Sequence, residues 1–553
     1  MGFISRQKET GVSDAVLTDI VEKDSVPWYK KPNLRILYLL LFPTCMGVEL
    51  TSGFDSQLIN ALQLSDYWKE CTVFPCLPAE YLANPRGRPD FGHPQGSLQG
   101  IIAAAYSLGA ILSLPLVPIV NDKFGRRWSI FLGSLVMILG ALIQGFSQHV
   151  GMYIVARMIL GFGIPTCIVA GSSLIGELAY PKERPIMTSL FNVSYFFGQI
   201  TAAGICFGTN SILSDWGWRI PSLLQICPSL LQITFVFFLP ESPRWLVSRD
   251  MSEEAREILI KYHAEGDSSS EFVSAEMAQI DATLKIEFEA SRRSWMDLLG
   301  TAGMRRRALI TSFLGLFTQW SGNTLISYYL GDLLEMIGWS DSVVKQKVNL
   351  VNACWSLVGA FLVALVVRRF KRRTMYLTCA AALLTVYICW TVSMERAVTA
   401  RDAGGENKAA GWAVIVFIFL YSPAYNIGYN ALTYTYLVEL WPYAERSRGI
   451  ALFQLFGRMA GFFTTFVNPI GLDGASWRYL ISYCCWLGFE IVFIFIFFPE
   501  TSGRTLEELA FLFESKELSD RAVIAVEKVV HHEDMPGTST HIDDIAPAHS
   551  SKV

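Results

Sequence analysis

The sequence is poor in charged residues. Only 17% of its 553 residues are Asp, Glu, Lys or Arg, whereas 52% are hydrophobic and the mean hydropathy is +0.35. Soluble domains carry about 25% charged residues. This shortage of charge excludes an ordinary soluble protein and indicates a chain that lies mostly within a membrane.

Motifs of catalysis and metal binding are also missing. The sequence contains no HExxH, no paired CxxC and no phosphate-binding loop with its lysine. The GFG at residues 161–163 lacks the third glycine and the preceding strand of a nucleotide-binding turn, and the sequon at 192–194 falls within an apolar run. We therefore expect no enzyme activity, no metal, no cofactor and no nucleic-acid partner.

The 11 cysteines do not indicate a disulfide scaffold, because most stand singly in apolar runs, where Cys acts as a small hydrophobic residue. Cys71 and Cys76 differ, since they lie in the one long loop that we expect outside the membrane. An oxidising exterior permits a disulfide there. Pro75 and the short spacing leave that pairing open.

Apolar runs long enough to cross a bilayer as a helix, about 20 residues, occur about twelve times. The first 34 residues contain no apolar signal run, so we expect the first span itself to direct insertion. The pattern predicts an all-α membrane protein with twelve transmembrane helices. The spans lie near residues 35–63, 98–120, 128–148, 151–177, 187–209, 218–239, 308–336, 347–367, 374–394, 411–439, 449–471 and 477–498.

A duplicated signature divides these helices into two sets of six. The sequence PESPR at 240–244 follows the sixth run, and PETSGR at 499–504 follows the twelfth. Such internal repeats are typical of secondary transporters. We predict a cytoplasmic segment at 1–34, six-helix halves at 35–239 and 308–509, a charged helical linker at 240–307, and a disordered cytoplasmic tail at 510–553.

Basic residues collect in alternate connections between the predicted helices. By the positive-inside rule these connections are cytoplasmic, which also places both termini in the cytoplasm. The basic residues concerned are Lys30, Lys31, Arg35, Lys123, Arg126, Arg127, Lys182, Arg184, Arg368, Arg369, Lys371, Arg372, Arg373, Arg446 and Arg448.

Several motifs, in this order, resemble the sugar porters of the major facilitator superfamily. They are NDKFGRR at 121–127, Arg157 at the start of RMILGFG, Glu177 with Arg184, and the two Pro-Glu-Ser/Thr elements. The resemblance covers residues 35–510. It implies the major facilitator fold and a plasma-membrane sugar transporter, which we expect to act as a monomer in the lipid bilayer.

Two further motifs resemble a narrower branch, the fungal lactose permeases and cellodextrin permeases. They are GFDS at 53–56 in the first span, and QWSGN at 319–323 followed by Tyr328 and Tyr329 in the seventh. This resemblance implies a disaccharide or short oligosaccharide as the substrate.

A buried acid and a buried arginine suggest coupling to protons. A charge at the centre of the bilayer costs about 2.5–3.5 kcal/mol, so it needs a partner or a function. Asp55 and Arg157 lie at similar depths, and we expect them to meet. Protonation of Asp55 would release Arg157 and shift the balance of conformations, and proton-coupled sugar porters carry an acid at this position. The alternative is a fixed ion pair in a passive facilitator. Glu49 is turned about 120° from Asp55 on its helix, so we expect it to be paired or interfacial.

Sugar binding needs amides and hydroxyls that donate and accept, together with aromatic rings. The spans offer suitable side chains, with Trp320 open between binding sugar and packing on a neighbouring helix. The candidates are Asn192, Gln199, Gln319, Trp320, Asn323, Tyr328, Tyr329, Tyr434 and Tyr436. Relative to hexose porters, Asn192, Thr318, Ser356 and Tyr434 replace Gln, Gln, Asn and Trp, which argues for a wider cavity or another sugar.

Arg458 stands in the eleventh span, about 15 Å from its cytoplasmic end, where sugar porters carry Asn or Gln before a Trp. An arginine at that depth needs an anion. Three interpretations stay open: an ion pair with Glu490, the carboxylate of a sugar acid such as a uronate, or a water-filled cavity.

Charged residues at the cytoplasmic ends are of the types that brace a closed conformation. The second-half loop departs from its counterpart, with Arg368 in place of Asp122 and Lys371 in place of Gly125, and we expect gating there to be altered. That departure keeps a second class open, a sugar sensor without transport. The predicted network comprises Asp122, Arg126, Arg127, Glu177, Arg184, Glu241, Arg244, Glu439, Arg446 and Glu500.

Overall fold

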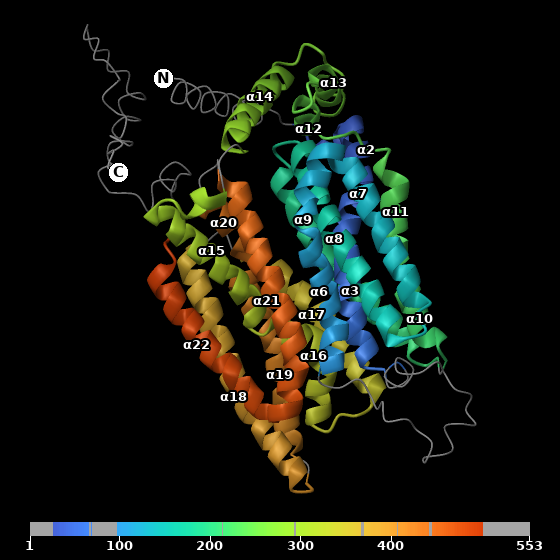
Figure 1. Ribbon diagram of the computed structural model, residues 1–553, viewed down its shortest axis with the longest axis vertical. Coiled ribbons are helices and arrows are strands. Elements are labelled where there is room, and N and C mark those ends of the chain that lie inside the picture. The colour runs from blue at the N-terminus through green and yellow to red at the C-terminus, as the bar shows by residue number, and fades with distance from the viewer. Residues whose placement is uncertain are drawn as a thin grey trace, which may run out of the picture.

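The computed structural model describes residues 26–65, 68, 97–212, 214–291, 295–366, 370–405, 407–441 and 445–501. Within these ranges every regular element is a helix and no strand occurs. Two bundles stand side by side, one blue to green and the other yellow to red (Figure 1). The expected loop disulfide of Cys71 and Cys76 and the tail at 510–553 lie outside the described residues.

The first bundle, called the first half below, begins with a helix that contains a π-helical segment. Pro43 lies in that segment, where its missing N–H group and its ring disturb ordinary α-helical bonding. The elements of this half are α2 (Pro32–Leu41), η2 (Phe42–Met46), α3 (Gly47–Gln63), α6 (Ser97–Ser113), α7 (Leu116–Gly145), α8 (Val150–Leu178), α9 (Arg184–Thr209), α10 (Trp216–Leu224) and α11 (Ile226–Val236).

The second half also contains interrupted helices. Gly322, with φ of 100°, separates α15 from α16, and that backbone conformation favours glycine. Its elements are α15 (Ala302–Trp320), α16 (Asn323–Met336), α17 (Ser342–Val366), α18 (Arg372–Asp402), α19 (Lys408–Tyr425), η5 (Asn426–Asn430), α20 (Ala431–Leu440), α21 (Arg446–Ala475) and α22 (Tyr479–Phe497).

Helix length and composition fit a membrane protein. In the described residues, seven helical stretches are long and apolar enough to cross a bilayer. Some predicted spans correspond to more than one element: α10 and α11 share the sixth, and α15 and α16 share the seventh. Helix breaks inside spans therefore account for part of the difference between seven stretches and the twelve expected.

Each half has an apolar core of its own. One core joins residues between Leu34 and Ile280, and the other is formed almost entirely by residues between Leu298 and Phe498. Burial of apolar surface holds each bundle together separately. The boundary between the halves is thus free to hold polar side chains.

Polar contacts join the halves at one end of the molecule, where α3, α16, α17 and the end of α9 meet. Asn349 accepts hydrogen bonds from Gln57 (2.6 Å) and Asn60 (3.0 Å), and Gln346 donates to Asn210 (3.0 Å). The linker helices lie at the opposite end (Figure 1). These contacts therefore hold the two halves together at the end away from the linker.

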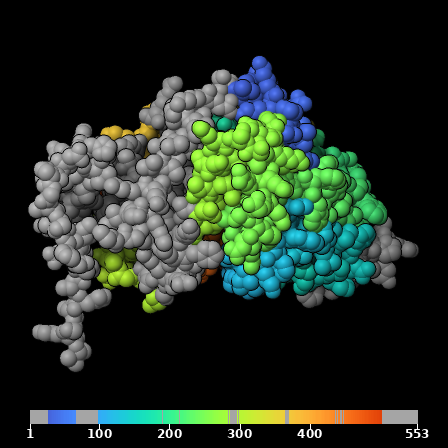
Figure 2. Space-filling model, turned by 90° about the horizontal axis from the view of Figure 1, so that it is seen from above, coloured from blue at the N-terminus to red at the C-terminus, as the bar shows by residue number. Residues whose placement is uncertain are grey.

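The linker contains α12 (Pro243–Val247), α13 (Ser252–Tyr262) and α14 (Glu271–Ser291). These green helices cover the end of the first half (Figure 2). Glu265 accepts hydrogen bonds from the backbone N–H groups of Asn33 and Leu34, each at 3.1 Å, and so caps the start of α2. The linker is thus attached to the first half.

Candidate functional site

A cavity of about 410 Å³ lies between the two halves. Its size is within the range of about 300–1,000 Å³ that small-molecule sites occupy. Serines, asparagines, glutamines and tyrosines dominate its lining, and Glu49 and Arg458 are the charged residues among those that line it. Such a lining suits a ligand with many hydroxyl groups.

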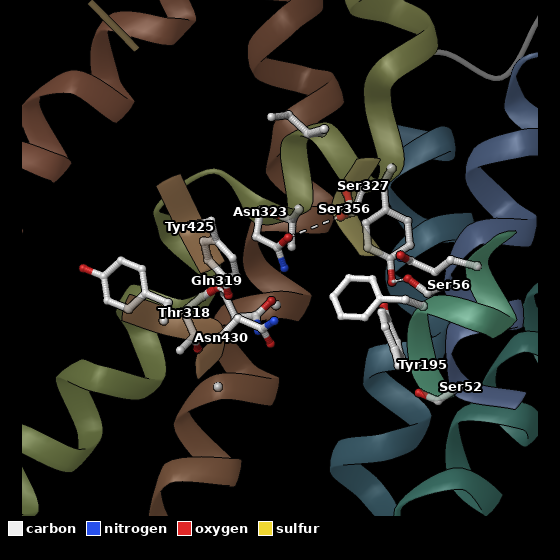
Figure 3. Close-up of a pocket in the computed structure, with 18 of the residues that line it drawn as sticks. Ser52, Ser56, Tyr195, Thr318, Gln319, Asn323, Ser327, Ser356, Tyr425 and Asn430 are labelled. Carbon is white, nitrogen blue, oxygen red and sulfur yellow. Dashed lines mark hydrogen bonds between the residues drawn. The ribbon is translucent and has the colours of Figure 1, made fainter. Parts of the chain in front are cut away.

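The first half supplies polar side chains from α3 and α9. Asn192 and Gln199, both expected from the sequence to bind substrate, line the cavity, together with Ser52, Ser56 and Tyr195. Figure 3 shows Ser52, Ser56 and Tyr195 on one side, facing residues of the second half. Two helices of one bundle thus present one polar wall.

The opposite wall comes from the second half. Gln319, Asn323, Tyr328 and Tyr434 all line the cavity, as the sequence predicted. Tyr328 bridges the two walls, since Ser56 Oγ lies 3.4 Å from its hydroxyl. The shorter residues Thr318 and Ser356, which depart from the hexose-porter pattern, also belong to the lining.

Sequence reasoning missed a row of side chains on α19 and η5. Tyr421, Tyr425 and Tyr429 repeat every four residues, as do Asn426 and Asn430, and all five line the cavity. The signal was available, because polar and aromatic residues four apart in an apolar helix share one face. The π-helix of η5 also marks the place, since such segments are frequent at functional sites.

Three predicted binding residues lie outside the cavity lining, and for them the expectation is wrong. The Trp320 indole donates to the carbonyl of Ala460 at 3.1 Å and packs against Phe463 and Trp486. Trp320 therefore packs on neighbouring helices, as its alternative interpretation held.

The other two are tyrosines. The Tyr329 hydroxyl donates to the carbonyl of Thr465 at 2.5 Å, and the Tyr436 hydroxyl donates to that of Pro499 at 3.1 Å. Both side chains are fully buried in the core of the second half. Their hydroxyls hold helices together.

Arg458 does not pair with Glu490, so that expected ion pair is wrong. Glu490 is fully buried and accepts a hydrogen bond from the Tyr429 hydroxyl at 2.7 Å. Arg458 instead lines the cavity, as does Glu49 of the opposite half, and the charges of these two residues act on each other. The cavity thus contains one positive and one negative side chain, on different halves.

Asp55 and Arg157 meet as expected. Arg157 Nη1 donates to Asp55 Oδ1 at 2.9 Å, and both side chains are almost completely buried. The guanidinium also lies 5.4 Å from the centre of the Tyr106 ring. Tyr106 also lines the large cavity, whereas Asp55 and Arg157 are not part of that lining.

The charged residues at the linker end form a network within the first half. Glu241 accepts hydrogen bonds from the backbone N–H groups of Arg126 (3.0 Å) and Arg127 (3.2 Å), and Arg126 forms two bonds of 3.2 Å with Glu177. Burial raises the pKa of the Glu241 carboxyl, although these N–H groups act against that rise. Asp122 contributes its carbonyl, to Trp245 and Arg249.

The second half has a matching network, in which the predicted residues Glu439 and Glu500 take part with Arg372 and Arg373. Glu500 accepts from the backbone N–H groups of Arg372 (2.9 Å) and Arg373 (3.2 Å), and Arg372 pairs with Glu439 at 3.3 Å. These contacts match those of the first half; Arg368 lies outside the described residues, and altered gating stays a prediction. Arg446 begins α21, and its side chain lies outside what the structure describes.

Arg184 takes part in a contact with the linker. It lies 3.9 Å from Glu276 of α14, and Glu276 also binds His263 Nδ1 at 2.7 Å. His263 Nε2 lies 3.1 Å from the carbonyl of Leu178. Although burial lowers the pKa of His263, Glu276 acts against it and the net shift is upward. Arg244 is the second residue of α12 and is half-buried.

The chain matches the model of the family described as "Sugar (and other) transporter" over residues 40–513. It is similar to the high-affinity glucose transporter of Kluyveromyces lactis, with 27% identity over 509 residues, 87% of this chain and 86% of that protein. It is also 27% identical over 421 residues to the low-affinity glucose transporter HXT3 of Saccharomyces cerevisiae, covering 74% of this chain and 72% of that one.

Solved structures agree on the fold. The inward-open conformation of the xylose transporter XylE from E. coli superposes with a TM-score of 0.68 and 22% identity, over 86% of this chain and 100% of that one. The proton:xylose symporter XylE bound to 6-bromo-6-deoxy-D-glucose gives a TM-score of 0.66 and 21% identity, over 86% and 99%. The helices described above thus form the major facilitator fold.

Proposed function

Because the chain belongs to the sugar (and other) transporter family, we propose that it carries a disaccharide or short oligosaccharide across the plasma membrane together with a proton. The observation that supports this proposal most is the buried ion pair of Asp55 and Arg157, which lies near a cavity lined by polar side chains. A neutral polyhydroxyl ligand fits such a cavity, and a carboxylate beside it offers a place for the proton.

The proton step uses the ion pair. With Asp55 ionised, Arg157 has its countercharge and the pair stabilises one arrangement of α3 and α8. Protonation removes the charge on Asp55 and leaves a buried guanidinium without its partner, which is costly. The proton therefore changes the relative stability of the two arrangements, and sugar binding selects between them.

The distribution of contacts supports alternating access. Hydrogen bonds between Gln57, Asn60 and Asn349 close the cavity at the end away from the linker, whereas the Arg126–Glu177 and Arg372–Glu439 pairs each stay within one half. If the linker faces the cytoplasm, as the basic loops predict, this arrangement faces inward. Opening to the outside then requires the Asn349 contacts to separate.

The size of the substrate follows from the residues that depart from the hexose-porter pattern. Asn192, Thr318 and Ser356 all line the cavity, and each is shorter than the family residue that it replaces. Shorter side chains leave more room, which supports a substrate larger than one hexose. The relatives described above are named as glucose transporters, so glucose is the reference substrate for any test.

One observation favours a second candidate, a sugar acid. Arg458 lines the cavity, and a guanidinium holds a carboxylate with two parallel hydrogen bonds. Glu49, however, already supplies a negative charge to the same cavity. We therefore propose a neutral substrate and treat a uronate as the competitor to be tested.

A sensor without transport is less well supported. That alternative rested on the departures in the second-half loop. The described part of this loop, Arg372 and Arg373, makes the same contacts with Glu500 and Glu439 as Arg126 and Arg127 make with Glu241 and Glu177. A passive facilitator would differ from the proposed symporter in one respect: the Asp55–Arg157 ion pair would stay intact throughout the transport cycle.

The test is uptake of labelled lactose, cellobiose, glucose and galacturonate in cells that lack their own carriers, with and without a protonophore. The proposal expects accumulation of a disaccharide that collapses with the protonophore. Uptake that never exceeds equilibrium would indicate a facilitator, and uptake of galacturonate alone would indicate a sugar-acid carrier. Ligand binding without any uptake would favour a sensor.

A further inference from the structure

A second and much smaller pocket is lined by Asp55 of the Asp55–Arg157 pair. Its volume is about 10 Å³, and its polar lining comes from Thr51 and Asp55 of α3, Tyr106 of α6, and Gln225 and Ser229 at the start of α11. Tyr106 lines both this pocket and the large cavity. The small pocket is thus a separate polar space that adjoins Asp55 from within the first half.

Three oxygen atoms around this pocket have no hydrogen-bond partner among the described residues. They are Asp55 Oδ2, Gln225 Oε1 and Ser229 Oγ, and the three residues are only 3%, 2% and 1% exposed. Each polar group left unsatisfied in a protein interior costs about 1–3 kcal/mol. Three such groups around one small pocket indicate a ligand that binds all of them.

The remaining polar atoms of these side chains are already engaged. Asp55 Oδ1 accepts from Arg157, and Gln225 Nε2 donates to Gln144 Oε1 at 3.5 Å. Two acceptors, Asp55 Oδ2 and Gln225 Oε1, therefore face the pocket with one hydroxyl that can donate, that of Ser229. A ligand with two donors and one acceptor matches this set.

Water has that set of groups, and the pocket is of the right size. One buried water needs about 10–15 Å³ of free volume and two to four polar partners. A metal cation fits less well, because it would lie next to the positive charge of the Arg157 guanidinium.

We propose that this pocket binds one water molecule, held by Asp55 Oδ2, Gln225 Oε1 and Ser229 Oγ, and that the coupled proton reaches Asp55 through it. The inference rests on the proposed proton symport. Oδ2 is the oxygen that takes the proton, because Oδ1 is occupied by Arg157.

The transfer is balanced. The incoming proton adds to the water, one O–H bond of that water breaks as a new one forms at Asp55 Oδ2, and the water remains as it was. The other charged or titratable groups that act on the ion pair are Tyr106 of α6, Tyr153 of α8 and Tyr328 of α16. Tyr106 is shared by the linings of the two spaces, whereas Asp55 lines the small pocket and not the sugar cavity, so the proposed water meets Asp55 outside that cavity.

The test is Ser229→Val, which fills the pocket and removes its donor, with Ser229→Ala as a milder variant. Ser222→Ala is the matched control. Ser222 lies in the preceding helix, α10, and is as buried as Ser229, but its hydroxyl donates a hydrogen bond to the backbone carbonyl of Trp218 in the same helix. Two readouts are compared: protonophore-sensitive accumulation of sugar, and exchange of labelled for unlabelled sugar at equal concentrations, which needs no net proton transfer.

Accumulation should fall by up to about tenfold in Ser229→Val, as for the loss of one hydrogen bond that holds the water, with exchange and the control unchanged. Unchanged accumulation, or an equal loss in both readouts, overturns the inference; if Ser229→Val does not reach the membrane, Ser229→Ala decides by the same criterion. A wild type without protonophore-sensitive accumulation would instead overturn the proposed function.

An experimental structure that shows ordered water must place one in this pocket, and a metal ion or a closed pocket there would also contradict the proposal.

Discussion

The two halves make the same contacts at the linker end, yet their interiors differ. Glu241 and Glu500 each accept from two consecutive arginine N–H groups, and Glu177 and Glu439 each bind the first of those arginines. Inside the bundles, by contrast, the first half has a buried ion pair and the second has Glu490 bonded to a tyrosine. The bracing contacts are thus the same in both halves, whereas we propose proton coupling for the first half.

The shared contacts arise from different backbones. Gly125 has φ of 86°, and a Cβ atom there would lie 2.7 Å from Glu241 Oε2. Its counterpart Lys371 has φ of −68° in an extended conformation that any residue adopts. A side chain replaces glycine in the second half because the turn there does not need positive φ.

The largest effect should come from removing the ion pair that distinguishes the interior of the first half from that of the second. Asp55→Asn keeps the size of the side chain but removes both the charge and the site of protonation. We expect the accumulation ratio of the sugar to fall to about 1, while exchange across the membrane persists. The measurement is uptake with and without a protonophore.

The matched control is Asp215→Asn, which alters another Asp–Arg pair, the partly exposed one with Arg219. It should leave accumulation within about twofold of wild type, since an exposed pair contributes little. Full accumulation by Asp55→Asn would remove the proposed role of the ion pair.

The equivalence of the two networks is tested by Glu241→Gln and Glu500→Gln. An amide accepts only at its oxygen, so each variant loses a charge-assisted bond to a backbone N–H. Both should lose about 2 kcal/mol of stability, measured as similar decreases in the melting temperature of the purified protein. Glu253→Gln, on the exposed surface of α13, is the control. A decrease confined to Glu241→Gln would show that the second network is not equivalent.

The difference in backbone predicts unequal effects at the two turns. Gly125→Ala forces a side chain into positive φ and against Glu241, at a cost of about 1–3 kcal/mol. Lys371→Gly, at an exposed extended position, should change stability by no more than about 0.5 kcal/mol. Melting temperatures of the two variants give the comparison, and equal effects would contradict the backbone account.

A smaller, pH-dependent effect is expected where the linker contacts the first half, at His263. Both ring nitrogens of His263 face acceptors, Glu276 and the Leu178 carbonyl, so the bound ring carries two protons. Its pKa is raised in the folded protein. The stabilisation is therefore complete below the unfolded value of about 6.5 and is lost as pH rises through the folded pKa.

The check compares the wild type with His263→Asn across that pH range. The difference in melting temperature should be largest at acidic pH and shrink as pH rises. The exposed His149, changed to Asn, should show no such trend. A difference that grows with pH would have the wrong sign.

Sequence reasoning succeeded where depth along a helix decides a contact. Asp55 and Arg157 were placed at similar depths by counting residues, and they meet. Asn192, Gln199, Gln319 and Asn323 were chosen by chemistry on predicted spans, and they line the cavity.

The predictions failed where the rotation of a residue around its helix axis decides whether it faces the cavity or the core. The break at Gly322 and the non-helical backbone of Tyr329 turn that ring into the core, and neither can be read from an ideal period. The π-helix at Asn426–Asn430 shifts the register of α20 in the same way. Tyr434 and Tyr436 are two residues apart, so one helix cannot present both to one cavity.

Partners far apart in sequence were the other limit. Arg458 and Glu490 were matched only because each needed a countercharge, yet the structure gives Glu490 the Tyr429 hydroxyl. A sequence states which groups need a partner, and tertiary packing selects the partner.

The central claim is that sugar and proton move together through the Asp55–Arg157 pair, and sugar-triggered proton entry tests it most directly. The purified protein in liposomes with a trapped pH dye would receive sugar on the outside without an imposed gradient. We predict acidification of the lumen with the wild type and none with Asp55→Asn. Sugar entry without any change in pH would contradict the claim and identify a passive facilitator.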